Sequence, residues 1–307
     1  MTPNHQGASI EWNTRTGLIA AISAYTIWGL FPIYLKSLTS IPVSAPEILT
    51  HRILWSVPFG ALILTLRKQW PEVKRALFNR KILAPLAAAA CVIALNWLVY
   101  VWAVGQERLL EASLGYYINP LMYVAAGVFI MKERLRRLQL WAVIIASIGA
   151  IVLVVGGGVF PWVAFVLALS FTTYGYIRKT TNVGAMPGLF IEVLIISPVA
   201  LLYLLWLKQT GASVFLNGEL STDGLLLLAG PVTVIPLLLF AIAARHLSLS
   251  ALGILQYIGP TLQFLLGLYF GEQFTAYHAI CFGLIWIALA IFSYDAFKHV
   301  KDPASAT

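Results

Sequence analysis

The chain has 307 residues, of which 60% are hydrophobic and only 10% are charged, and its mean hydropathy is +0.85. A soluble domain carries roughly 25% charged residues, so this composition excludes a water-soluble enzyme or binding module and indicates an integral membrane protein. The net charge of +8 does not indicate nucleic-acid binding, because the basic residues are concentrated in short segments between apolar stretches.

Ten apolar stretches follow one another along the chain, each close to the roughly 20 residues that a helix needs to cross a membrane. They are continuous and do not alternate with polar residues, which favours helices over an outer-membrane barrel. We therefore predict an all-α integral membrane protein with ten transmembrane helices. The predicted helices cover 16–36, 47–66, 82–104, 111–131, 138–156, 160–178, 187–207, 223–244, 250–270 and 275–297.

The basic residues predict the orientation of these helices. If the helices alternate in direction, 16 of the 20 lysines and arginines fall on one side, most of them in the loops 67–81 and 132–137. By the positive-inside rule we expect that side, with the tails 1–15 and 299–307, to be cytoplasmic. The first 15 residues lack the features of a signal peptide, so we expect the first helix to be retained.

The two halves of the chain resemble each other. Tyr117-Ile118-Asn119-Pro120 recurs as Tyr257-Ile258-Gly259-Pro260, and Trp28-Gly29 aligns with Tyr174-Gly175. Five such similarities occur in the same order at offsets of 138 to 146 residues. We interpret them as two copies of one ancestral unit.

The predicted units are residues 16–156 and 157–298, with five helices each. Because five is odd, the second unit must enter the membrane from the opposite side, which makes the two an inverted repeat. The basic loop 67–81 corresponds to 208–222, which keeps a single lysine, as inversion requires. Inverted repeats are frequent in secondary transporters, where the substrate binds near the membrane midplane, although some channels also have them.

Several longer strings carry a resemblance to a known family. They are Glu47-Ile48-Leu49-Thr50-His51-Arg52, Glu111-Ala112-Ser113-Leu114-Gly115-Tyr116-Tyr117-Ile118-Asn119-Pro120-Leu121, Gln256-Tyr257-Ile258-Gly259-Pro260-Thr261-Leu262 and Ile285-Trp286-Ile287-Ala288-Leu289-Ala290-Ile291-Phe292. From about residue 15 to 298 the chain resembles RarD-type permeases of the EamA branch of the drug/metabolite transporter superfamily.

The resemblance implies ten helices in two EamA repeats, cytoplasmic termini, a bacterial inner-membrane location, and export or exchange of small metabolites. The RarD-type name is associated with chloramphenicol sensitivity, but the resemblance supplies no substrate. Amino acids, aromatic metabolites and amphenicol-like drugs are the candidates.

Ionisable side chains inside predicted spans are costly, so they are functional candidates. These are Glu47, His51 and Arg52 in the second span and Glu192 in the seventh, with Arg52 and Glu192 at equivalent positions of the two units. Their predicted depths differ by roughly 15 Å, which argues against a permanent bridge between them.

Their roles have alternatives. We expect Arg52 to bind an anionic or polar substrate group, or to latch to Glu111 as a gate, and Glu192 to serve the inner half. Alternatively, Arg52 extends toward the outer surface and pairs with Glu47 or Glu111, which would only orient helices. His51 is a candidate proton carrier, since an unperturbed histidine titrates near neutrality.

Further polar and aromatic residues lie at or near the predicted midplane. Asn and Gln in a span need a partner, either another helix or a solute, and paired aromatic residues suit a lining for flat or amphiphilic solutes. Ordinary core packing is the alternative for each. The candidates are Trp28, Asn96, Trp97 and Tyr174, and, further from the midplane, Tyr117, Asn119, Gln256 and Tyr257.

Pro120 and Pro260 interrupt the fourth and ninth spans at matched positions. Each proline lacks one backbone donor and can kink a helix, and paired interruptions point to a binding region, although a packing kink is the alternative.

Catalytic signatures are missing from the sequence. It has no His-Glu-x-x-His, no Cys-x-x-Cys and no phosphate-binding loop, so we expect no enzyme activity, no metal and no organic cofactor. The expected partners are a small-molecule substrate, the lipid bilayer and, as an open possibility, protons, while the oligomeric state stays open. We predict a secondary active transporter, an exporter or exchanger that works by alternating access, with a passive channel or facilitator as the alternative.

Overall fold

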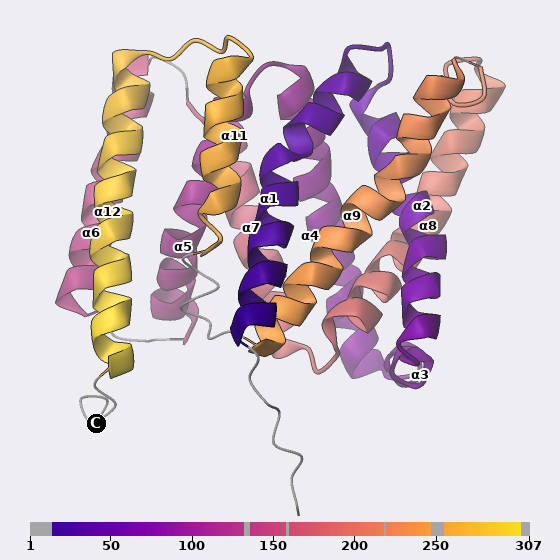
Figure 1. Cartoon of the computed structure of the whole chain (residues 1–307), viewed down its shortest axis with the longest axis horizontal. Coiled ribbons are helices and arrows are strands. Elements are labelled where there is room, and N and C mark those ends of the chain that lie inside the picture. Colours follow the sequence, from indigo (N-terminus) through magenta and orange to yellow (C-terminus); the bar gives the residue numbers. More distant parts are fainter. Residues whose placement is uncertain (1–13, 132–135, 158–159, 218, 247–254, 302–307) are drawn as a thin grey trace, which may run out of the picture.

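The computed structural model describes residues 14–131, 136–157, 160–217, 219–246 and 255–301, which form helices joined by short turns (Figure 1). The helices are α1 (Thr14–Thr39), α2 (Ala45–Leu66), α3 (Trp70–Leu77), α4 (Arg80–Gly105), α5 (Leu109–Met131), α6 (Arg137–Gly157), α7 (Trp162–Thr180), α8 (Ala185–Gln209), α9 (Leu220–His246), α11 (Ile258–Tyr269) and α12 (Ala276–Lys301).

A helix overlaps each of the ten predicted spans. In the described part of the chain, seven helices are both long and apolar enough to cross a membrane. The all-helical membrane fold is therefore confirmed, whereas the crossing of ten segments stays a prediction.

One predicted loop is wrong. Residues 70–77 of the basic segment form the short helix α3, with Pro71 in its first turn, where the missing N–H breaks no bond. Val73 and Ala76 are buried while Arg75 is exposed, so α3 is amphipathic and packs against α4 and α8.

The ninth predicted span also differs from the structure. Gln256 and Tyr257 form a turn, and α11 begins at Ile258, which places Pro260 in its first turn. Pro260 therefore lies in the first turn of a helix, directly after the turn at Gln256 and Tyr257 that interrupts the predicted span. Its counterpart Pro120 lies within α5, which continues from Leu109 to Met131.

The two halves interlock. The main helix contacts are α6 with α12, α1 with α9 and α11, α2 with α8 and α9, α5 with α7 and α11, and α4 with α7 and α8. Each of these pairs joins one helix from residues 16–156 to one from 157–298, so the halves do not form separate bundles. Figure 1 shows α6 and α12 side by side at one end of the molecule.

Glycines allow some of these helices to approach closely. A Cβ at Gly230 of α9 would lie 2.5 Å from the backbone oxygen of Trp55 in α2, and one at Gly115 of α5 would lie 2.8 Å from that of Ala164 in α7. In a membrane, where lipid is as apolar as the side chains, close approach of this kind holds helices together.

The first and last helices of the chain have their outer ends at the same edge of the bundle. In Figure 1, α1 begins, α12 ends and α3 lies at the lower edge, while the α11–α12 connection lies at the upper edge. The termini of the helical bundle are thus on the same side as the basic helix α3. That this side is cytoplasmic stays a prediction.

Candidate functional site

Arg52, on the second turn of α2, is buried, with only 5% of its surface exposed. Its Nε donates a hydrogen bond to Oγ1 of Thr233 in α9 at 3.2 Å. Its guanidinium carbon lies 4.8 Å from the ring centroid of Phe31 and 4.6 Å from that of Trp97. Its Nη1 is buried and has no hydrogen-bond partner within the described residues.

No carboxylate lies within salt-bridge distance of Arg52 in the described part of the chain. Neither the predicted latch to Glu111 nor the alternative pairing with Glu47 is formed in this structure, because both acids have other partners. Oε1 of Glu47 accepts from Oγ of Ser213 and from the N–H of Val214, each at 2.9 Å.

Glu111 serves a helix start. It accepts from the N–H of Val163, at the beginning of α7, at 2.8 Å, and it pairs with Arg108 at 2.6 Å. The alternative in which Arg52 extends to the surface also fails, because its side chain is buried.

A row of aromatic rings leads away from Arg52. Phe31 stacks on Tyr100 with centroids 6.1 Å apart, and Tyr100 meets Tyr116 at 5.7 Å. Tyr116 meets Phe171 at 6.0 Å, and Phe171 meets Tyr174 at 6.3 Å. The row crosses from α1 through α4 and α5 to α7.

Glu192 of α8 lies at the far end of this row and is fully buried. The hydroxyl of Tyr174 donates to its Oε2 at 3.0 Å, and Nη1 of Arg178 lies 3.3 Å from its Oε1. Gly188, one turn before Glu192, leaves the space that the Arg178 guanidinium occupies. As predicted, no salt bridge joins Arg52 to Glu192 within the described residues; the acid has its own arginine.

The start of α8 ties this end together. Arg178 Nη2 donates to the carbonyls of Gly184 and Ala185 at 3.1 and 3.2 Å. Oε1 of Glu72 in α3 accepts from the N–H of Gly184 at 2.8 Å. The short helix α3 thus holds the beginning of α8 beside the Arg178–Glu192 pair.

Asn96 is bonded between helices. Its Nδ2 donates to Oγ of Ser170 at 2.9 Å and to the carbonyl of Leu167 at 3.1 Å, both in α7. Tyr116 donates to its Oδ1 at 3.5 Å. Asn96 therefore positions Tyr116 in the aromatic row.

His51 faces away from the row. It is buried, its Nδ1 accepts from Nε1 of Trp55 at 3.1 Å, and its ring lies 4.7 Å from that of Phe215. Its Nε2 has no partner in the described part of the molecule.

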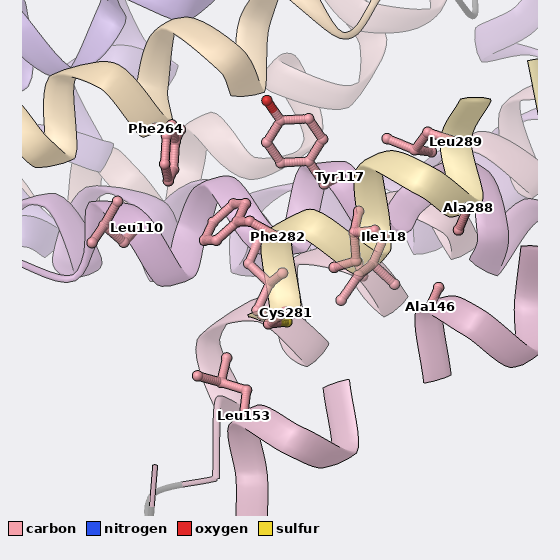
Figure 2. Packing of buried hydrophobic residues seen from close by; sticks show 14 of the residues in the cluster. Leu110, Tyr117, Ile118, Ala146, Leu153, Phe264, Cys281, Phe282, Ala288 and Leu289 are labelled. Carbon is pink, nitrogen blue, oxygen red and sulfur yellow. The ribbon is translucent and has the colours of Figure 1, made fainter. Parts of the chain in front are cut away.

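Tyr117 and Tyr257, the tyrosines of the repeated Tyr-Ile-x-Pro string, lie together. Tyr117 is on a different face of α5 from Tyr116. Tyr117 stacks on Tyr257 with centroids 6.2 Å apart, and its hydroxyl is 2.7 Å from Oγ1 of Thr261. Figure 2 shows Tyr117 above Phe282 in the core that α5, α11 and α12 share. These tyrosines line a hollow of about 320 Å³ with Trp286 and Ser293.

The remaining predicted residues are scattered. Trp28 packs on Tyr25 and Phe240 between α1 and α9. Asn119 is fully buried, and neither amide atom has a partner within the described residues. Gln256 is half-buried in the turn before α11.

A second hollow, of about 480 Å³, is apolar and lies between α2 and α9, beside Pro58 and Pro231. Neither hollow reaches Arg52, whose surroundings are closed in this conformation.

Comparison with known proteins identifies the family. Residues 15–155 match the EamA-like transporter family. An "Uncharacterized transporter" of Vibrio cholerae is 45% identical over 299 residues, covering 97% of this chain and 96% of its own length. The chain belongs to the EamA-like transporter family.

Other matches agree with this assignment. "Protein RarD" of Escherichia coli is 43% identical over 284 residues, covering 92% of this chain and 95% of its own length. A solved structure titled only "Crystal structure of protein" has the same fold, with a TM-score of 0.58, 20% identity and coverage of 90% of this chain and 96% of that one. This EamA-like protein is thus a multi-pass membrane transporter related to RarD.

Several residues of the candidate site of this EamA-like transporter have no clear signal in the sequence. Thr233 and Phe31 contact Arg52 only through long-range packing, which leaves no local signal. In the sequence Arg178 is one of many basic residues on the side predicted to be cytoplasmic. The spacing of Gly188 and Glu192, four residues apart in α8, indicates a helix face on which a long basic side chain could pack and pair.

Gln263 of α11 is a further polar residue of a span, and a proline in α1 indicates the partner that it binds. Pro32 lacks the N–H that would bond the carbonyl of Trp28 four residues earlier, and Nε2 of Gln263 donates to that carbonyl at 3.1 Å. In α8 the carbonyl of Leu194, freed by Pro198, accepts instead from Oγ of Ser197 at 2.8 Å.

We predict that Gln263→Leu lowers the free energy of unfolding by about 0.5–1.5 kcal/mol, because the Trp28 carbonyl loses its donor. In a Pro32→Ala background the restored N–H satisfies that carbonyl, so the same change is expected to have a much smaller effect. Unfolding of the four proteins in detergent measures both values. An equal loss in both backgrounds would contradict this role for Gln263.

Proposed function

We propose that the chain is a secondary active transporter that exports or exchanges small metabolites or drugs across the bacterial inner membrane. It works by alternating access between two inverted five-helix repeats, with Arg52 in the substrate site. Family membership supports transport itself. The observation that carries the mechanism is the pattern of contacts between helices.

The main contacts between the two halves are unchanged when the halves are exchanged. The exchange replaces α1, α2, α4, α5 and α6 by α7, α8, α9, α11 and α12. The contact α1–α9 then becomes α7–α4, α5–α7 becomes α11–α1, and α2–α9 becomes α8–α4, all of which are present. The pairs α2–α8, α5–α11 and α6–α12 exchange into themselves.

Such a pattern is expected of two related units around a two-fold axis, which in an inverted repeat lies in the membrane plane. The stacking of Tyr117 on Tyr257, equivalent residues of the two units, supports the same axis. Two units related in this way can exchange conformations, which converts an outward-open form into an inward-open form.

The two ends of the aromatic row lie toward opposite edges of the helical bundle. Because α3 follows α2 at the lower edge of Figure 1, α2 begins at the upper edge, near Arg52. Glu72 of α3 contacts the start of α8, so Glu192 lies toward the lower edge. We infer that the substrate moves along the row between them, and that the Arg178–Glu192 pair with Tyr174 closes the lower side.

Glu192 and His51 are the candidates for proton coupling. Both side chains are fully buried in helices, and both can change charge by binding or releasing a proton. Two more of the predicted residues support this path: Trp97 lies against Arg52, and Asn96 holds Tyr116.

The inverted topology is tested by cysteine labelling. Arg67 and Ala212 are exposed and lie in the equivalent segments 67–81 and 208–222. In a chain whose Cys91 and Cys281 are replaced by alanine, we predict that an impermeant maleimide labels Ala212→Cys in intact spheroplasts and Arg67→Cys only after permeabilisation. Labelling of both from one side would exclude the inversion.

Transport is tested by flux into proteoliposomes. We predict saturable uptake and counterflow for at least one solute among amino acids, aromatic metabolites and amphenicols, measured with and without a proton gradient. Arg52→Ala and Glu192→Gln are expected to lose at least about 90% of this flux, because a buried charge at the binding or gating position is lost.

The exposed Arg80→Gln is the control and is expected to retain normal flux. Non-saturating flux without counterflow would instead identify a channel.

A further inference from the structure

We propose that the Arg52 site takes a ligand with a single negative charge, of the carboxylate type, attached to a flat aromatic body. This inference rests on the proposed function, since it names the substrate class of the same site. Four observations carry it: the missing counter-ion, a second arginine in a matching setting, the unpaired donors and the surrounding rings.

The counter-ion of Arg52 is missing because the described carboxylates are all engaged elsewhere. A buried guanidinium without an acid is costly in a membrane protein, so an anion from outside the chain would relieve the cost. The engagements of the carboxylates are Glu47 with Ser213 and Val214, Glu72 with Gly184, Glu107 with Lys36, Glu111 with Arg108 and Val163, Glu192 with Arg178 and Tyr174, Glu219 with Ser221, Asp223 with Leu216, Glu272 with Leu109 and Leu110, and Asp295 with Arg136.

Arg108 shows how this protein satisfies a similar guanidinium. Its guanidinium carbon lies 5.7 Å from the ring centroid of Trp102 and 5.4 Å from that of Trp162, and Oε2 of Glu111 completes the arrangement at 2.6 Å. Arg52 also lies against two rings, at shorter distances and more deeply buried, but no carboxylate of the described residues accompanies it. A ligand carboxylate would take the place that Glu111 takes beside Arg108.

Two unpaired donors indicate where the anionic group would bind. Nη1 of Arg52 and the hydroxyl of Tyr100 are both buried without a partner in the described residues. Phe31 connects them, since it contacts the guanidinium and stacks on the Tyr100 ring. Because the rings of Phe31 and Trp97 lie against the guanidinium, its N–H edge is left for the oxygens of a planar anion.

The charge of the ligand follows from that of the site. One uncompensated positive charge matches one negative charge, whereas a second negative charge would itself be buried unpaired and a cation would be repelled. The rings of Phe31 and Trp97 lie against the guanidinium and Tyr100 stacks on Phe31, so a site that opens here would favour a flat ring by stacking.

The test uses three probes with the same ring and different charges. The purified full-length protein in lipid nanodiscs is titrated with indole-3-acetate, indole-3-acetamide and tryptamine, with hexanoate as an anion that lacks a ring. We expect indole-3-acetate to bind at least about tenfold more tightly than each of the others, as a charge-assisted hydrogen bond to a buried guanidinium requires. Equal binding of the acetamide or tryptamine, or no binding of indole-3-acetate, would overturn the proposal.

Variants link the preference to Arg52. Arg52→Gln is expected to remove the preference for the acetate over the acetamide, and the isosteric Thr233→Val, which removes the Nε partner, is expected to reduce it severalfold. The double variant Arg108→Gln/Glu111→Gln removes the matching pair without leaving a charge behind and is expected to keep the preference. A preference that survives in Arg52→Gln refutes the assignment.

The experiments distinguish an error in the proposed ligand class from an error in the proposed transport function. Counterflow of a cationic or neutral solute would overturn the ligand class and leave the carrier standing. Specific binding of indole-3-acetate with no counterflow of any solute would support the ligand class and contradict the carrier.

Discussion

The guanidinium of Arg52 is buried among aromatic rings and, among the residues that the structure describes, has a single hydroxyl partner and no acid. Burying a charge costs several kcal/mol, of which a desolvated cation–π contact returns about 2 kcal/mol. The remaining cost is a reason to expect a role for Arg52 other than stability. Phe31, the ring at which the aromatic row begins, lies directly against this charge.

Three acids have a different role, because they bind helix starts across the two halves. Glu111 binds the start of α7, Glu272 binds the N–H groups at the start of α5, and Glu72 binds the start of α8. Carboxylates are favourable at helix starts, where backbone donors are unpaired and the dipole is positive. Each of these hydrogen bonds joins one half of the chain to the other.

Much of the fold could be predicted because the membrane imposes simple rules of length and hydrophobicity. The approximate helix positions followed from these rules, while α3 and the start of α11 did not, since a short amphipathic helix and a turn before Pro260 fall outside a search for long apolar stretches.

The site was only partly predictable. Polar residues in spans pointed to Arg52, Glu192 and Asn96, but their partners depend on which helix faces which. Thr233 lies 181 residues from Arg52 in sequence. Tyr116 and Tyr117 are neighbours that face different sets of helices, which no single-sequence pattern reveals.

The most direct measurement of the central claim is the thermal stability of ligand-free Arg52→Met beside Arg108→Met. Methionine keeps much of the side-chain volume and removes the charge. If Arg52 is an uncompensated cation that awaits a ligand, its replacement should raise Tm or leave it unchanged, whereas Arg108→Met should lower Tm because Glu111 loses its partner. An equal fall in Tm for both variants would mean that Arg52 is a structural residue, which would contradict the account.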